Sequence, residues 1–126
     1  MSAPEASIII DQGSEFALVL HDRDQNDQPI NYASGFVLRA AIKQRRESAE
    51  FVYNLSPLSN PAHGTLTNGS DPEMGNIQIL IPAGVTAAFP VMNEGFFWVS
   101  VEPTDNAQAR QTIVLGRVKV RKGGLE

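Results

Sequence analysis

Cysteine is absent from this chain of 126 residues, so disulfides, zinc–thiolate sites and cysteine nucleophiles are excluded. Histidine is scarce, because only His21 and His63 occur, and no G-x-S-x-G motif accompanies them. The glycines are scattered as turn residues without a phosphate-binding spacing, and no pair of carboxylates stands out for glycosidase chemistry. We therefore predict a protein that is not an enzyme, with no catalytic, cofactor-binding or metal-binding residues.

Long apolar runs are also missing. None reaches the length of a transmembrane helix, and the opening MSAPEASIIID lacks the positively charged start of a signal peptide. We expect a protein made in a cytosol, and kept there or packaged from it, without membrane contact.

The net charge of -4 and the pI of about 5.1 argue against bulk nucleic-acid binding. The final pair, Leu125 and Glu126, is either native or a remnant of cloning, and we assign it no function.

Strand patterns occupy almost the whole sequence. The length favours one domain, 1–126, in which 1–6 and 122–126 are expected to be flexible ends. Short alternating segments with turn signals about every ten residues predict an antiparallel sandwich of about seven strands, and an eight-stranded barrel is the competing architecture. Residues 83–89 predict one helical turn stopped by Pro90, with Phe89 closing an end of the core. The expected strands are 7–11, 16–21, 36–43, 51–55, 65–67 (a minor one), 76–81, 94–102 and 108–121.

The last of these strands changes phase. Ile113 and Leu115 share one parity, whereas Val118 and Val120 share the other. One extra residue would restore a common apolar face, so we predict a bulge near Gly116 or a crossing of the strand between two sheets.

The polar turn DRDQNDQP is the densest cluster of oxygen ligands. Asp22, Asp24 and Asn26 imitate the opening of an EF-hand loop, but Asp27 stands where that loop needs glycine and Ala33 where it needs glutamate. We interpret the segment as a solvated turn stabilised by its Asp and Asn side chains.

The strand 94–102, EGFFWVSVE, is apolar on both faces. Alternation places Phe97, Val99 and Val101 on one face, where we expect them to join Leu38, Ile77 and Ile79 in a core. The opposite face presents Phe96 and Trp98, the only tryptophan. A strand apolar on both sides is central, covered by another element, or part of a binding surface.

Eight of the ten basic residues fall in two segments, 39–46 and 117–122. In a sandwich the third strand and the last two strands commonly share a sheet, so Phe96 and Trp98 would lie between basic side chains on its outer face. Three hypotheses follow: basic stems cover Trp98, the face contacts a protein, or it stacks single-stranded nucleic acid. The predicted partner-binding residues are Phe96, Trp98, Arg39, Arg117 and Lys119.

The string IIIDQGSEFALVLHDRDQNDQPINYASG, followed by FVLRAAIKQ, resembles the opening of small phage and prophage virion proteins. Their later half is similar to NIQILIP, TAAFP, EGFFWVSVE and GRVKV in that order, so the resemblance extends from Ile8 to Val120. It implies an immunoglobulin-like sandwich that is a structural or accessory part of a tail, neck or baseplate. It also implies assembly in the host cytoplasm, other virion proteins as partners, and a homo-oligomer such as a ring or trimer. A carbohydrate- or host-surface-binding module of the same fold is the alternative.

Overall fold

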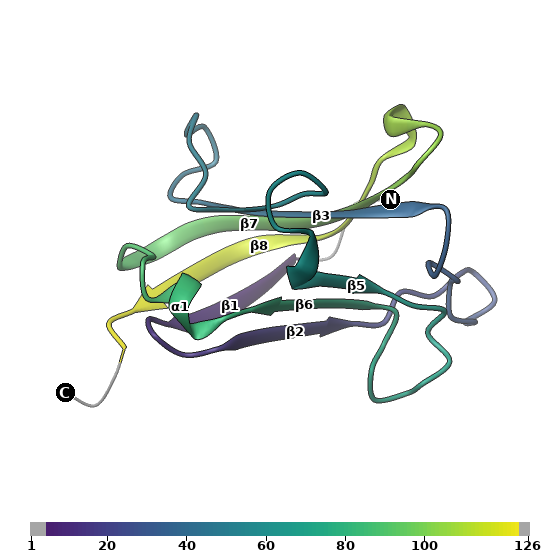
Figure 1. Cartoon of the computed structure of the whole chain (residues 1–126), viewed down its shortest axis with the longest axis horizontal. Coiled ribbons are helices and arrows are strands. Elements are labelled where there is room, and N and C mark those ends of the chain that lie inside the picture. Colours follow the sequence, from purple (N-terminus) through teal and green to yellow (C-terminus); the bar gives the residue numbers. More distant parts are fainter. Residues whose placement is uncertain (1–4, 124–126) are drawn as a thin grey trace.

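Two β-sheets pack face to face in the computed structural model, which describes residues 5–123 (Figure 1). The larger sheet has five strands in the order β1–β8–β7–β3–β4, and the smaller has three in the order β2–β6–β5. The strands are β1 (Glu5–Asp11), β2 (Phe16–Leu20), β3 (Phe36–Lys43), β4 (Tyr53–Leu55), β5 (Gly64–Leu66), β6 (Ile77–Ile81), β7 (Met92–Pro103) and β8 (Gln111–Arg121).

Among residues 5–123, helical structure is limited to short turns. The α-helix α1 spans Ala83–Thr86, within the predicted segment, and two 3₁₀ turns span Pro61–His63 (η1) and Ala107–Ala109 (η2). Within residues 5–123 no helix is long and apolar enough to cross a membrane.

Every pairing is antiparallel except that of β1 with β8, which is parallel. The sequence predicted only antiparallel neighbours. The turn after Asp11 takes the chain from the edge of the larger sheet to the edge of the smaller one, so β1 and β2 do not form a hairpin. The ladder continues one residue beyond β1, where the Gln12 amide donates to the Arg121 carbonyl at 3.0 Å.

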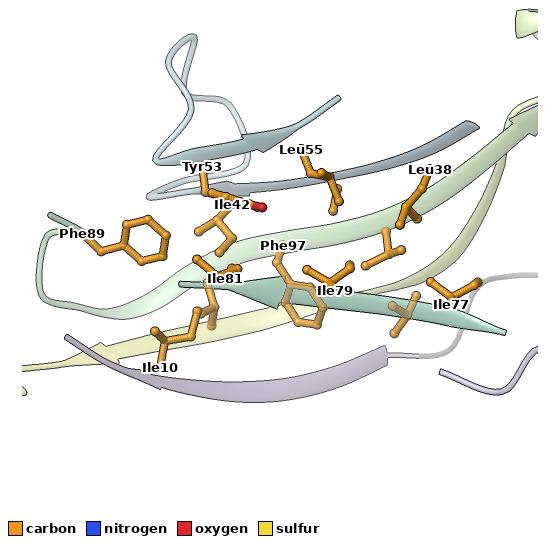
Figure 2. Packing of buried hydrophobic residues seen from close by; sticks show 14 of the residues in the cluster. Ile10, Leu38, Ile42, Tyr53, Leu55, Ile77, Ile79, Ile81, Phe89 and Phe97 are labelled. Atoms are coloured by element: carbon orange, nitrogen blue, oxygen red, sulfur yellow. The ribbon is translucent and has the colours of Figure 1, made fainter. Parts of the chain in front are cut away.

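The core lies between the two sheets (Figure 2). Alternation in the strands places one apolar face of each sheet inward, and Ile77 and Val118 are fully buried. Phe89, just after α1, is buried at one end of this core, and the Gln12 side-chain amide donates to its carbonyl. Seven predicted core residues are confirmed: Leu38, Ile77, Ile79, Phe89, Phe97, Val99 and Val101.

The irregularity in β8 lies at Ile113, and the predicted bulge near Gly116 is wrong. The β7–β8 register shifts between Val99 and Ser100, which skips Ile113, while Gly116 pairs regularly with Phe97. Val114 is consequently buried in the core, and Leu115 faces away from it. Glycine is needed at 116 for another reason: a Cβ there would lie 1.7 Å from the Ala6 carbonyl oxygen of β1.

The ends of the chain differ in part from the expectation. Glu5 and Ala6, assigned from the sequence to a flexible end, are the first residues of β1. The rest of the expected N-terminal end, 1–4, and residues 124–126 of the C-terminal end lie outside the described residues.

Candidate functional site

The outer face, meaning the side of the five-stranded sheet turned away from the smaller sheet, brings together the predicted aromatic and basic residues. β7 lies between β3 and β8, as the sequence predicted. Phe96 is paired on one side with Lys43 and on the other with Arg117. Trp98 is likewise paired with Ala41 and Leu115.

Three aromatic side chains form a patch on this face. Phe96 and Trp98 have ring centroids 5.5 Å apart at 40°, and Phe51 lies 6.1 Å from Trp98 at 51°. We call Phe51, Phe96 and Trp98 the aromatic patch. Ala41 belongs to the same face yet is only 4% exposed, so larger side chains cover it. Phe96 and Trp98 are half-buried, whereas Phe51 is exposed.

Basic side chains cover part of the aromatic patch. The Lys43 ammonium lies 4.7 Å from the Phe51 ring centroid and 5.7 Å from that of Trp98. The Arg46 guanidinium lies 5.1 Å from the Phe96 ring. Such contacts stabilise exposed sites by about 0.5–1 kcal/mol each. The hypothesis that basic stems cover Trp98 is therefore confirmed for Lys43, while Arg46 covers Phe96.

A second cluster on the outer face is an ion-pair network around Glu102. This carboxylate, 6% exposed, accepts from the Arg39 guanidinium at 2.7 Å and from that of Arg110 at 2.9 Å. The hydrogen bond from Arg39, with a smaller contribution from Arg110, lowers the pKa of Glu102 below its ordinary value although burial opposes this. The charge of Arg39 is thus already neutralised within the chain, which the sequence did not indicate.

This network predicts a pH dependence of stability. Because the pKa of Glu102 is lower in the folded chain than its ordinary value of 4.5, ionised Glu102 stabilises the fold above that value. The contribution disappears as the pH falls through the lowered folded pKa. Glu102→Gln is therefore expected to be less stable than wild type at neutral pH, and the difference should shrink in acid. Urea unfolding of both proteins between about pH 7 and pH 2 measures this; a difference independent of pH would contradict it.

Beside the aromatic patch the outer face is hollowed to a volume of about 510 Å³. The sheet contributes Phe96 and Leu115, and the β3–β4 loop contributes exposed arginines from above. Arg117 pairs with Glu94 at 3.5 Å, whereas Arg45 and Arg46 have no ion-pair partner among residues 5–123. We call this site the arginine hollow, and the residues that line it include Arg45, Arg46, Glu94, Phe96, Leu115 and Arg117.

Of the five residues predicted from the sequence, Phe96 and Arg117 line the arginine hollow, and Trp98 adjoins Phe96. Arg39 belongs to the Glu102 network, and Lys119 is exposed on β8, paired with Ile9 of β1. All five thus lie on one sheet, but they do not form one cluster.

Sequence reasoning missed Phe51 and Leu115. Phe51 was taken as the first residue of a strand, but β4 begins at Tyr53, and Phe51 instead packs on Trp98. Leu115 was assigned to the inner face by the misplaced bulge. A signal existed for Leu115, which is out of phase with the buried Val118 and Val120. Phe51 has the same parity as the buried Tyr53 and Leu55, so strand alternation gave no sign of its outward position.

The remaining polar candidates have structural partners. His63 stacks on Tyr53 and its Nδ1 lies 2.9 Å from the Tyr53 hydroxyl, whose pKa burial raises to about 12. His21 is exposed just beyond β2. In the polar turn, Asp22 accepts from the Tyr32 hydroxyl, and Asp24 accepts from two backbone amides. Among the described residues no three His, Cys, Asp or Glu side chains are grouped to hold a metal ion.

Comparison with known proteins identifies the fold. The chain matches no protein-family model and no curated protein sequence. It is similar to the structure of the extracellular domain of the voltage-gated sodium channel beta4 subunit, at 11% identity and a TM-score of 0.50, covering 98% of this chain and 97% of that one. A second similar structure is Dscam1 isoform 7.44, N-terminal four Ig domains, at 12% identity and a TM-score of 0.44; 95% of this chain covers 23% of that one. The chain is an immunoglobulin-like β-sandwich.

In this Ig-like chain the two sheets are joined without a disulfide, since the sequence has no cysteine. Many Ig domains contain an inter-sheet disulfide packed against a buried tryptophan. Here Trp98 lies on the outer face, and the core is filled by aliphatic residues with Tyr32, Tyr53, Phe89 and Phe97. The sole tryptophan is therefore available to the surface of the sheet.

Proposed function

We propose that this chain is a non-catalytic protein-interaction module of a phage virion, belonging to its tail, neck or baseplate, and that its outer face is the contact surface. The observation that supports the proposal most is the arginine hollow beside the aromatic patch. Tryptophan and arginine are enriched among the residues that dominate binding energy at protein interfaces. The order of segments from IIIDQG to GRVKV, similar to virion proteins, supports the placement in a virion.

Association with further copies of itself is part of this proposal. The sodium channel beta4 domain is described as forming parallel homodimers that explain its role in cell–cell adhesion. In the present chain, half-buried aromatics on the sheet and arginines without ion-pair partners among residues 5–123 on the adjacent β3–β4 loop offer area and charge for a protein contact.

Substitutions in the aromatic patch and in the arginine hollow test the contact surface. Trp98→Ala and Arg117→Glu are each expected to weaken self-association at least tenfold, because large aromatic and arginine side chains contribute disproportionately to binding. Sedimentation equilibrium measures the dissociation constant, and circular dichroism confirms folding. The control is Leu80→Ala, which removes an exposed apolar side chain from the smaller sheet. If Trp98→Ala, Arg117→Glu and the control all have the dissociation constant of wild type, the outer face is not the interface.

The alternative, a carbohydrate-binding module, requires aromatic rings available for stacking on sugars. The rings of the aromatic patch are mutually tilted by 40° and 51°, and Lys43 covers two of them. This geometry favours a protein contact. A glycan array with the isolated chain separates the two functions, since specific binding that Trp98→Ala abolishes would favour the carbohydrate module.

A further inference from the structure

The arginine hollow has an excess of positive charge in a chain that is acidic as a whole. Three arginines line it together with Glu47 and Glu94, so its lining carries one positive charge in excess, and Arg117 is paired with Glu94. Arg45 and Arg46 extend from the exposed β3–β4 loop, and Arg46 is held over the Phe96 ring at 5.1 Å. An occupant that matches this site would bring carboxylates for the arginines and would fit beside an aromatic ring.

The chain itself contains such an occupant at its other end. The β2–β3 loop includes the segment Asp22–Asp27, which we call the acidic turn, and its residues 23–27 are exposed. Figure 1 shows this loop and the β3–β4 loop at opposite ends of the long axis of the sandwich. One copy therefore cannot place its own acidic turn in its own hollow, but a second copy can.

The acidic turn is ordered by its own hydrogen bonds before any partner binds. The Asp24 carboxylate accepts from the Asn26 and Gln28 amides at 2.8 and 3.0 Å, and the Asp24 amide donates to the Gln28 carbonyl at 2.9 Å. The side chain of Asp27 is 89% exposed, and its ion pair with Arg23 is long, at 3.9 Å. A preformed turn loses little conformational entropy on docking, which favours binding.

We propose that the arginine hollow of one copy binds the acidic turn of a second copy, head to tail. This inference rests on the proposed function, because it names the partner of the same face. The contact is heterologous, since the two surfaces differ, so repetition of it produces a closed ring or an open filament. Carboxylates of Asp27 and its neighbours would pair with Arg45 and Arg46, while the turn backbone would lie on Phe96 and Leu115.

Two complementary variants test the contact. The hollow variant is Arg45→Gln with Arg46→Gln, which removes the charge without creating a site for the lysine of the turn variant. The turn variant is Asn26→Lys with Asp27→Asn, which keeps at position 27 a residue suited to its φ of +60° and leaves the Asp24 hydrogen bonds to backbone amides intact. Each variant alone should be monomeric at concentrations where wild type assembles. An equimolar mixture should form a 1:1 pair and nothing larger, because it contains one native hollow and one native turn.

Light scattering measures these masses, and increasing salt should weaken wild-type assembly. Glu73→Lys, a change of two charges in the nearby β5–β6 loop, should weaken assembly less than the turn variant.

Three results would each overturn the head-to-tail contact: a monomeric wild type, a turn variant that assembles like wild type, or a mixture without a 1:1 pair. If the turn variant assembles normally while Trp98→Ala does not, this inference fails and the proposed function stands; if neither variant matters, both fail.

Discussion

Replacement of Gly116 by alanine is expected to lower the free energy of unfolding by about 3 kcal/mol, because the new Cβ cannot coexist with β1. An alanine Cβ would lie 1.7 Å from the Ala6 carbonyl oxygen and 2.7 Å from its carbon. Both atoms are backbone, so no side-chain rotation relieves the clash. Movement of β1 would in turn withdraw Ile10, 1% exposed, from the core.

Urea unfolding followed by the fluorescence of Trp98 measures this loss. Amide hydrogen exchange adds a local readout: β1 should lose protection while β3 and β7 retain it. The matched control is Gly84→Ala in α1, where a Cβ meets nothing within 4 Å. That variant should be as stable as wild type or slightly more stable, since alanine is the better helix former. Equal stability of the 116 variant and wild type would show that β1 is not held as described.

Replacement of Asn76 by alanine is the second change with a large expected effect, also about 3 kcal/mol. Asn76 is 1% exposed, and its side chain makes three hydrogen bonds to the β2–β3 loop. Its Oδ1 accepts from the Asp22 amide at 2.8 Å, and its Nδ2 donates to the carbonyls of Asp22 and Ile30 at 2.8 and 3.0 Å. Truncation leaves the Asp22 amide and the Ile30 carbonyl without these partners at a site that is largely closed to water, while the Asp22 carbonyl keeps only its bond from the Ile30 amide at 3.2 Å.

Thermal unfolding of Asn76→Ala should show the lower stability, and proteolysis should cut the β2–β3 loop sooner than in wild type. Asn26→Ala is the matched control, because that side chain is exposed and only its backbone amide is bonded. It should unfold like wild type. A stable Asn76→Ala protein with a protease-resistant loop would mean that the backbone alone holds the acidic turn in place.

Much of the fold was predictable because it depends on local patterns. Alternation placed Phe97, Val99 and Val101 inward, and β3 spans the predicted residues 36–43. The outward position of Phe96 and Trp98 follows from the same period of two. Gly116 marked an unusual place in β8, although its role is close approach to β1 and the irregularity lies at Ile113.

The candidate site was predictable only in part. The face of a sheet on which a strand side chain lies can be inferred from alternation, but the conformation of a loop that covers this face cannot. The parity of β3, β7 and β8 predicted that Lys43, Phe96 and Arg117 share a face. No pattern indicated that residues 44–51 fold back, so that Phe51 packs on Trp98 and Arg46 on Phe96. Likewise, no local pattern indicated that Glu102 pairs with Arg39, which is 63 residues away in sequence, as well as with Arg110 across the β7–β8 connection.

By itself, the sequence determined that this is a cysteine-free β-sandwich with a strand apolar on both faces, because strand alternation and turn residues act over a few neighbouring positions. Only the tertiary structure decided which arginine side chains among residues 5–123 lack an ion-pair partner, that β1 pairs in parallel with β8, and that a hollow forms beside Phe96. These features depend on contacts between segments that are distant in sequence. The spacing of apolar residues within one segment does not indicate which distant contacts are favourable.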